Sequence, residues 1–256
     1  MTDLAKHRDR RPIADKIAAD IRALVMAGEW EPGSQVPSNS ELQEQYGTSN
    51  MTVQRALAAL KDEELLEGRS GSGVFVRDHA TQTISPASYM APSEPGEPYR
   101  WVSEAAERDQ RGSNKILRVA EVKPPKRVAK ALGLGAQGTA VLRSRIGLLN
   151  DEPAELANSY YPIELAKGTR LADRRKIPGG SPTLLAEMGY PPREQADEVA
   201  ARKATREEHE HLELPGDVAV LEIFRVVYSD NQRPIEVTEL IKPGHLYKMG
   251  YHLPMH

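Results

Sequence analysis

The stretch that decides the fold runs from Val36 to Val76 and reads VPSNSELQEQYGTSNMTVQRALAALKDEELLEGRSGSGVFV. It begins with Ser38-Asn39-Ser40-Glu41, which has the form of a capping box. The serine hydroxyl accepts from the N–H of Glu41, and the glutamate reaches back to the start of the helix. We expect this helix to end at Tyr46, because Gly47 tolerates the left-handed conformation that closes many helices.

A second helix follows at once, with Ser49 as its N-cap. Its apolar residues repeat at helical spacing and are Val53, Ala56, Leu57 and Leu60. Residues 65–76 then carry strand-like apolar residues at both ends and the glycines Gly68, Gly71 and Gly73 between them. Because glycines permit tight turns between strands, this segment predicts a β-hairpin.

An amphipathic helix is predicted before this stretch, over residues 13–27, with Gly28 as its stop. Its apolar positions are Ile13, Ile17, Ile21, Leu24 and Val25. The order helix, helix, turn, helix, hairpin predicts a winged helix-turn-helix domain over residues 10–78.

Residues 79–98 are rich in Pro, Ser and Thr, a composition typical of a linker. Residues 99–253 mix strand and helix patterns, which predicts an α+β domain. The predicted strands are 117–122, 140–149, 219–228 and 235–241, and the predicted helices are 127–134, 181–189 and 205–214.

This second domain also repeats itself loosely. Asn150-Asp151-Glu152-Pro153 precedes Glu155, and Asn231-Gln232-Arg233-Pro234 precedes Glu236. Each copy has the pattern helix end, strand, hairpin turn, strand. Chance similarity between two ordinary hairpins remains an alternative at this stage.

Composition sets limits on the function. The 256 residues include no cysteine, which excludes disulfide scaffolds, thiolate metal sites and cysteine nucleophiles. No apolar run approaches the roughly 20 residues of a membrane helix, and the N-terminus has no signal-peptide pattern, so we expect a soluble cytoplasmic protein. Residues 1–78 contain 10 Lys and Arg against 13 Asp and Glu. Any positive field for nucleic acid must therefore come from local placement rather than net charge.

A helix-turn-helix places its second helix in the major groove of DNA. Side chains there can read bases, since amides pair with adenine and arginine pairs with guanine. The first helix would hold phosphate at its N-terminus, and the hairpin tip would enter the minor groove. The candidate DNA-binding residues are Ser38, Asn39, Ser40, Ser49, Asn50, Met51, Thr52, Gln54, Arg55, Arg69, Ser70, Gly71, Ser72 and Gly73.

The stretch from Val36 to Val76 closely resembles the signature of GntR-family transcriptional regulators. The second domain resembles the UTRA effector domain of the HutC subfamily. The motifs that carry this second resemblance are Tyr99-Arg100-Trp101, Pro124-Pro125, Leu132-Gly133-Leu134, Asn150-Asp151-Glu152-Pro153 and Tyr160-Tyr161-Pro162.

The resemblance implies a homodimer on a palindromic operator in double-stranded DNA, a chorismate-lyase-like antiparallel sheet, and repression relieved by a small molecule. The chain departs from the family at Asn39, where Glu is usual, at Asn50, where Arg is usual, and at Gln54, where Arg is frequent. We therefore expect an operator that differs from the common consensus and is read more through adenine.

The resemblance also implies an effector pocket, for an anionic or sugar-like ligand, at one end of the sheet. Its candidate residues are Arg145, Ser159, Tyr161, Ser181, Thr183, Glu236 and Tyr247. A second family arginine is replaced by Gly147 and a family acid by Ala157, which argues against an amino-sugar phosphate. Arg145 can instead be a strand residue paired with a nearby acid, and a structural role is favoured for Glu236 and Tyr247.

No catalytic residues, metal ligands or cofactors are predicted. His209 and His211 point away from each other on a helix, and the sequence has no nucleophile elbow or phosphate loop. Three alternatives to an effector-released repressor stay open at this stage. These are a ligand-independent DNA-binding repressor, a partition-type protein of a mobile element, and a lyase-like enzyme.

Overall fold

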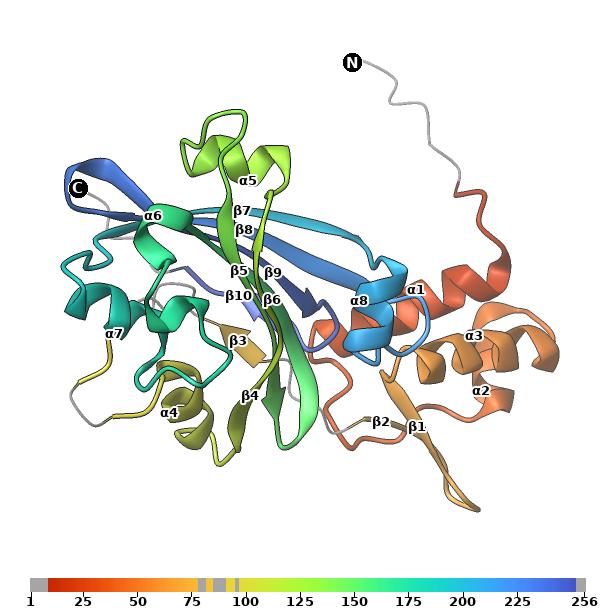
Figure 1. Cartoon of the computed structure of the whole chain (residues 1–256). Helices are drawn as coiled ribbons and strands as arrows, with labels where there is room; N and C mark the ends of the chain where they lie inside the picture. Colours follow the sequence, from red (N-terminus) through yellow and green to blue (C-terminus); the bar gives the residue numbers. More distant parts are fainter. Residues whose placement is uncertain (1–8, 78–81, 85–90, 95–96, 252–256) are drawn as a thin grey trace, which may run out of the picture. The chain divides into compact units, whose positions relative to one another are not determined.

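The computed structural model describes residues 9–77, 82–84, 91–94 and 97–251, which form two units (Figure 1). One unit contains the described residues up to 77, and the other contains nearly all those from 82 onward. Most of the predicted 79–98 linker and residues 252–253 of the predicted second domain lie outside the described residues. No helix in the described part of the chain is long and apolar enough to cross a bilayer.

The N-terminal unit has the predicted order of helices and hairpin. Its elements are α1 (Ile13–Met26), α2 (Asn39–Tyr46), α3 (Asn50–Asp62), β1 (Leu66–Arg69) and β2 (Gly73–Val76). The predicted caps are confirmed: Ser38 and Glu41 form a capping box, Gly47 is left-handed with φ 58°, and the Ser49 side chain accepts from Thr52 N–H.

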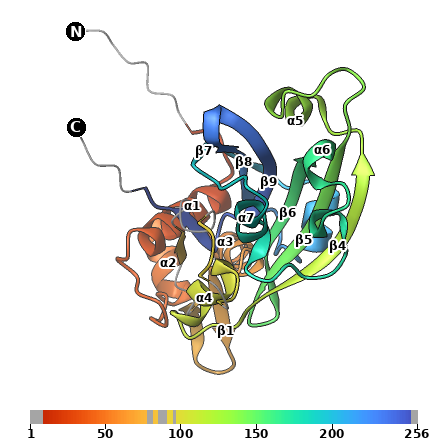
Figure 2. The same ribbon diagram turned by 60° about the vertical axis from the view of Figure 1, so that its left-hand side comes forward.

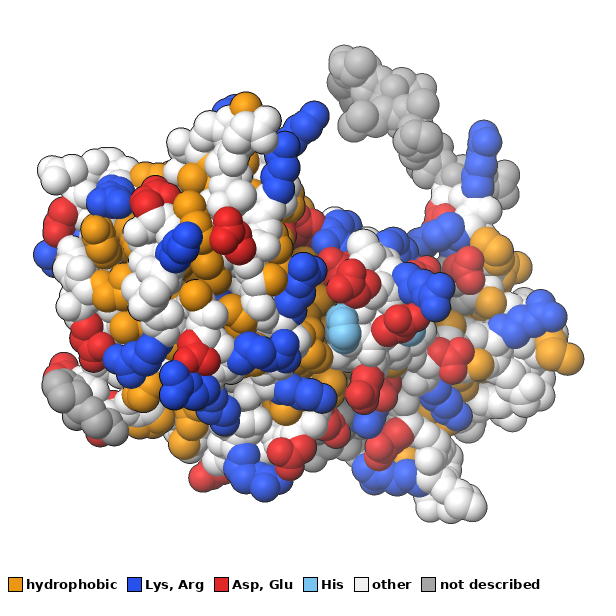
Figure 3. Space-filling view, in the orientation of Figure 1, with side chains coloured by type: hydrophobic (Ala, Val, Ile, Leu, Met, Phe, Trp, Pro, Cys, Tyr) orange, Lys and Arg blue, Asp and Glu red, His pale blue; other side chains and the backbone are white. Residues whose placement is uncertain are grey.

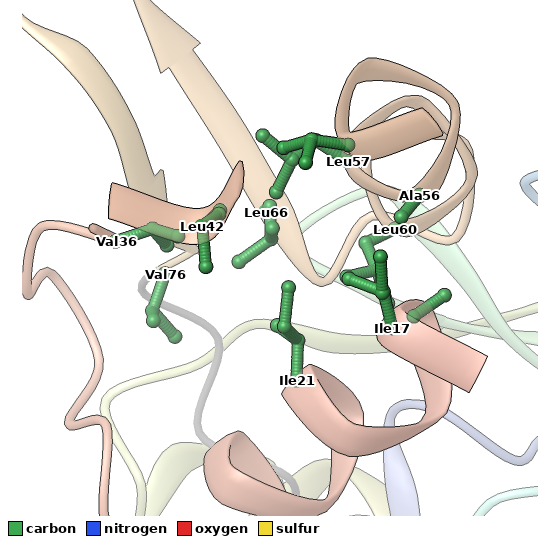
Figure 4. Close-up of a cluster of buried hydrophobic side chains, with 11 residues drawn as sticks. Ile17, Ile21, Val36, Leu42, Ala56, Leu57, Leu60, Leu66 and Val76 are labelled. Atoms are coloured by element: carbon green, nitrogen blue, oxygen red, sulfur yellow. The ribbon is translucent and has the colours of Figure 1, made fainter. Parts of the chain in front are cut away.

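A single apolar core holds this unit together (Figure 4). Ile21, Leu42 and Leu60 are each 0% exposed and come from three different helices. Burial of a side chain of this size contributes about 1.5–3 kcal/mol. The other buried core residues are Ile17, Ala18, Val36, Val53, Ala56, Leu57, Leu66 and Val76. The core therefore fixes α3 against α1 and α2 and leaves the opposite face of α3 exposed.

The second unit is built on a six-stranded antiparallel sheet of strand order β4-β5-β6-β9-β8-β7. The strands are β4 (Gly112–Val122), β5 (Ala140–Leu149), β6 (Glu152–Pro162), β7 (Glu194–Lys203), β8 (Ala219–Ser229) and β9 (Arg233–Pro243). The short strands β3 (Gln82–Ile84) and β10 (Tyr247–Met249) form a separate parallel pair. The helical elements are α4 (Arg100–Ala106), α5 (Lys126–Ala131), α6 (Ile163–Ala166), α7 (Gly180–Glu187) and α8 (Arg206–His211), with the 3-10 turns Arg170–Ala172 and Asp230–Gln232.

The two faces of the sheet differ in chemistry. On one face, α5 and the end of α8 pack on apolar strand residues such as Phe224 and Ile241. The other face carries α4, α6, α7 and β10 (Figure 2). On this second face, charged and hydroxyl side chains lie between the apolar clusters; all are buried except Arg145, whose side chain is 17% exposed. We call this set the polar layer; its members are Arg143, Arg145, Glu155, Ser159, Asp197, Arg225, Glu236, Thr238 and Lys242.

The internal repeat is present in the structure. Each copy consists of a helix, a strand, a tight hairpin and a strand: α5-β5-β6 and α8-β8-β9. Both hairpin turns use left-handed residues, with φ 52° at Asn150 and φ 57° at Asn231. In both copies the register shifts just before the turn, at Gly147/Leu148 and at Val227/Tyr228. The central pair β6·β9 therefore relates two similar three-stranded halves.

Candidate DNA-binding and effector sites

The N-terminal end of α3 is an exposed polar surface. Met51 is 61% exposed, and Asn50, Gln54 and Arg55 are also exposed. Their neighbours Val53 and Ala56 face the core. Thr52 is half-buried, and its hydroxyl lies 3.0 Å from that of the cap Ser49. The helical period thus separates base-reading candidates from core residues.

Asn39 and Asn50, two positions where the chain departs from the family pattern, contact each other. Asn39 Nδ2 donates to Asn50 Oδ1 over 3.1 Å, which joins the first turns of α2 and α3. A neutral amide pair therefore stands where the resemblance implies an acid and an arginine. Asn50 keeps its own NH₂ group to donate, while Asn39 keeps its carbonyl oxygen.

The β1–β2 hairpin has its turn at Ser70-Gly71-Ser72, where Gly71 has φ 71°. Gln35 Nε2 donates to Ser72 O over 2.9 Å and braces this tip. Arg69 does not extend from the tip: its guanidinium pairs with Glu67 at 2.9 Å and lies 4.2 Å over the Phe75 ring. To reach DNA, Arg69 must leave Glu67, which costs little for an exposed pair.

Acidic and basic side chains are interspersed on the face of the molecule shown in Figure 3. This agrees with the near balance of charge in residues 1–78. For the predicted DNA-binding role, a few local cations and the helix N-termini would have to supply the attraction for phosphate.

In the second unit, a chain of hydrogen bonds crosses the centre of the sheet. Ser159 on β6 and Thr238 on β9 are direct cross-strand neighbours, and their hydroxyls lie 2.8 Å apart. Arg145 donates to Ser159 Oγ over 3.0 Å. At the other end, Thr238 Oγ1 donates to Glu236 Oε1 over 2.7 Å. The sheet register thus brings Arg145, Ser159 and Glu236 together.

Ion pairs flank this chain on both sides. Glu155 pairs with Lys242 at 2.5 Å and lies 3.7 Å from Arg145. Arg225 donates to both oxygens of Asp197 over 2.8 Å, and these side chains are 4% and 6% exposed. Burial disfavours charge on Glu155, but Lys242 and Arg145 hold its pKa below the usual value.

Arg143 has a structural role in the same layer. Its guanidinium donates to the carbonyl oxygens of Arg170, Leu171, Asp173 and Arg175 and so holds the loop after α6. Burial lowers the pKa of Arg143, whose hydrogen bonds within the described part of the chain go to neutral carbonyl oxygens.

Tyr161 and Ser181 lie together beside the chain. Burial, followed by the nearby Glu236, raises the pKa of Tyr161, and hydrogen bonds with Ser181 and Ser159 oppose that rise. Tyr161 is 1% exposed, so it carries a neutral hydroxyl between these groups.

The remaining two effector candidates have other contacts. Thr183 Oγ1 donates to Gly179 O and accepts from Ser93 N–H, both over 2.9 Å, so it fixes the start of α7 to the segment before α4. Tyr247 on β10 is 4% exposed and packs with Trp101 and Ala154, with Lys242 Nζ 4.9 Å from its ring centre. A binding role for these two residues stays a prediction.

Sequence reasoning missed several members of the polar layer. These are Arg143, Asp197, Arg225, Thr238 and Lys242, while Glu155 was noted only as part of the repeat. The available signal was the presence of charged residues at alternate positions of otherwise apolar strands. Burying a charge is costly unless it is paired, so such residues indicate a buried polar cluster.

Comparison with known proteins gives two matches of family models. Residues 13–76 match the model described as bacterial regulatory proteins, gntR family. Residues 107–248 match the UTRA domain model.

Full-length relatives agree with both matches. The chain is 29% identical over 248 residues to an uncharacterised HTH-type transcriptional regulator of Streptomyces coelicolor, SCO4628, covering 94% of this chain and 91% of the relative. It is 24% identical over 246 residues to the HTH-type transcriptional repressor NagR of Bacillus subtilis, covering 94% and 95%. A crystal structure attributed to a GntR-family transcriptional regulator aligns with a TM-score of 0.65 and 25% identity over 96% of this chain and 99% of that one.

Proposed function

Because the chain belongs to the gntR family of bacterial regulatory proteins and carries a UTRA domain, it is a DNA-binding transcriptional regulator, and we propose that it is a repressor released from a palindromic operator by a small molecule. The observation that carries the proposal is the pairing of two sites in one chain. An exposed recognition helix begins at Asn50, and a buried polar layer centres on Arg145 and Glu236.

A homodimer fits this proposal, since a two-fold symmetric dimer places two recognition helices one DNA turn apart on a palindrome. We infer that ligand ordering in the UTRA domain changes the spacing of the two DNA-binding domains through the residues that connect them. Only a ligand that binds the two arrangements with different affinity can do this. The protein would act in the cytoplasm, where its operator lies.

We propose no catalytic activity for the sheet domain. Glu155 and Asp197 are paired with Lys242 and Arg225, and one oxygen of Glu236 accepts from Thr238, an arrangement that suits binding rather than proton transfer. A partition-type role would use DNA binding without a small-molecule response, so release by a ligand separates the two functions.

The test is footprinting on the DNA upstream of the protein's own gene, with and without a pool of cellular metabolites. We expect two protected half-sites about 10 base pairs apart, and loss of protection with the pool. The variant Arg145→Gln should bind the operator normally but resist release. The matched control Arg127→Gln changes an arginine on the opposite face of the sheet and should be released like the wild type.

Three results would contradict the proposal. Absence of a specific footprint would show that the protein does not regulate its own gene. Protection that no pool relieves would favour a ligand-independent DNA-binding protein. Turnover of a pool component would favour an enzyme.

A further inference from the structure

The internal repeat allows each charged side chain of one half of the sheet to be compared with its counterpart in the other half. Arg145 lies opposite Ala157 in β5–β6, and Arg225 lies opposite Thr238 in β8–β9, at the same distance from the hairpin. By the same register, Glu155 corresponds to Glu236. At these matched positions each half thus contributes one arginine and one glutamate to the polar layer.

The two arginines differ in what their outer neighbour strand provides. Arg225 lies opposite Asp197 on β7, which receives both of its hydrogen bonds. Arg145 lies opposite Ile116 on β4, which offers no acid. Among the described residues, the only hydrogen bond that Arg145 makes is to the neutral Ser159, and its nearest carboxylate is Glu155 at 3.7 Å.

The two glutamates differ in the opposite sense. Glu155 pairs with Lys242 of β9, which lies opposite Leu221 of β8. The corresponding position in the other half is Tyr161, opposite Val141, which carries a neutral hydroxyl instead of an ammonium. Glu236 is only 3% exposed, and within the described part of the chain no donor lies within hydrogen-bond distance of its Oε2.

The repeat therefore leaves one incompletely paired cation and one incompletely paired carboxylate, joined by the Ser159–Thr238 hydroxyl pair. Three hydrogen bonds of 3.0, 2.8 and 2.7 Å connect Arg145 to Glu236 through Ser159 and Thr238. We propose that the effector is zwitterionic: its anionic group binds Arg145 and its protonated amine binds Glu236. This rests on the proposed effector-released function and names the ligand class of that site.

The unpartnered oxygen of Glu236 favours a zwitterion over a plain anion. The layer contains four cations, Arg143, Arg145, Arg225 and Lys242, and three carboxylates, Glu155, Asp197 and Glu236. An anion alone would neutralise the excess positive charge but would leave Glu236 Oε2 buried without a donor. A zwitterion adds no net charge, and its amine supplies the donor that Glu236 Oε2 lacks.

The test measures thermal unfolding of the full chain with a series of ω-amino acids: glycine, 3-aminopropanoate, 4-aminobutanoate and 6-aminohexanoate. Each is compared with an equimolar mixture of the carboxylate and the alkylamine of the same carbon number. We expect at least one amino acid to raise Tm more than its mixture. Glu236→Gln and Arg145→Gln should each weaken its apparent affinity at least tenfold.

The matched control is Glu239→Gln, on the same strand but on the opposite face, where its carboxylate contacts Tyr160. This control should keep the wild-type response. The proposal is overturned if the mixtures match the amino acids, if a carboxylate alone gives the full shift in Glu236→Gln, or if no member of the series shifts Tm. Operator footprinting of the same samples separates this failure from failure of the regulator function, because the footprint and its release by the pool do not require a zwitterion.

Discussion

Replacing Asn50 by arginine tests whether the first turn of α3 meets DNA. Asn50 is exposed at the N-terminal end of α3, so a longer cationic side chain fits without disturbing the core. Each added phosphate contact steepens the dependence of log K on log salt by about 0.9 unit. For one arginine on each helix of a dimer, the slope steepens by about 1.8 units, which is about a 12-fold extra loss of affinity between 50 and 200 mM salt.

The assay is fluorescence anisotropy on the footprinted operator at several salt concentrations. Gln45→Arg adds the same charge to an exposed position near the C-terminal end of α2 and serves as the control. We expect a smaller slope change there. If Asn50→Arg leaves the slope unchanged while Gln45→Arg steepens it, α3 is not the recognition helix. The double variant Asn39→Glu/Asn50→Arg should shift base preference toward guanine, because a carboxylate then replaces the amide that now orients residue 50.

Three further predictions concern stability, measured by urea unfolding of the full chain. Ser38→Ala removes the hydroxyl that accepts from Glu41 N–H, while the backbone N–H of residue 38 can still donate to the Glu41 carboxylate; it should destabilise the N-terminal unit by about 1 kcal/mol, whereas Ser40→Ala should have little effect. Leu42→Ala, at a site that is 0% exposed, should cost about 2–5 kcal/mol, and a loss below the lower value would mean that the core collapses around the cavity. The folded pKa of Glu155 is lowered, so its stabilisation is present above the ordinary value of 4.5 and is lost as pH falls through the lower folded pKa. Glu155→Gln should therefore flatten the acid limb of the stability profile, and an unchanged profile would contradict the pairing with Lys242.

The N-terminal unit was predictable from the sequence because its signals are local. A capping box, a left-handed glycine and a 3.6-residue apolar repeat each act within a few residues. Strand β7 was not predicted, since EQADEVAARK is mostly exposed at the edge of the sheet and has no clean apolar alternation. The short helix α4 was also missed, because its seven residues are too few for a periodic signal.

The candidate effector site was predictable only in part. The resemblance suggested Arg145, Ser159 and Glu236, but their contact depends on the register of β6 against β9, which joins residues about eighty positions apart. Local patterns do not specify such a register. The resemblance also suggested Thr183, but its hydroxyl is hydrogen-bonded to Gly179 and Ser93 rather than to the polar layer.

The polar layer is hard to explain as a device for stability. Buried ion pairs often contribute less than apolar residues of the same size, because removing two charges from water costs about as much as their attraction returns. The opposite face of the sheet shows that this fold can be packed with apolar side chains, as Phe224 and Val237 do against α5. Arg225 and Asp197 complete each other, whereas among the described residues Glu236 Oε2 has no hydrogen-bond partner and Arg145 has a carboxylate only at 3.7 Å. The charged groups of the sheet are thus least fully paired at the positions where its two halves differ. A charged ligand would form the most favourable new contacts at those positions.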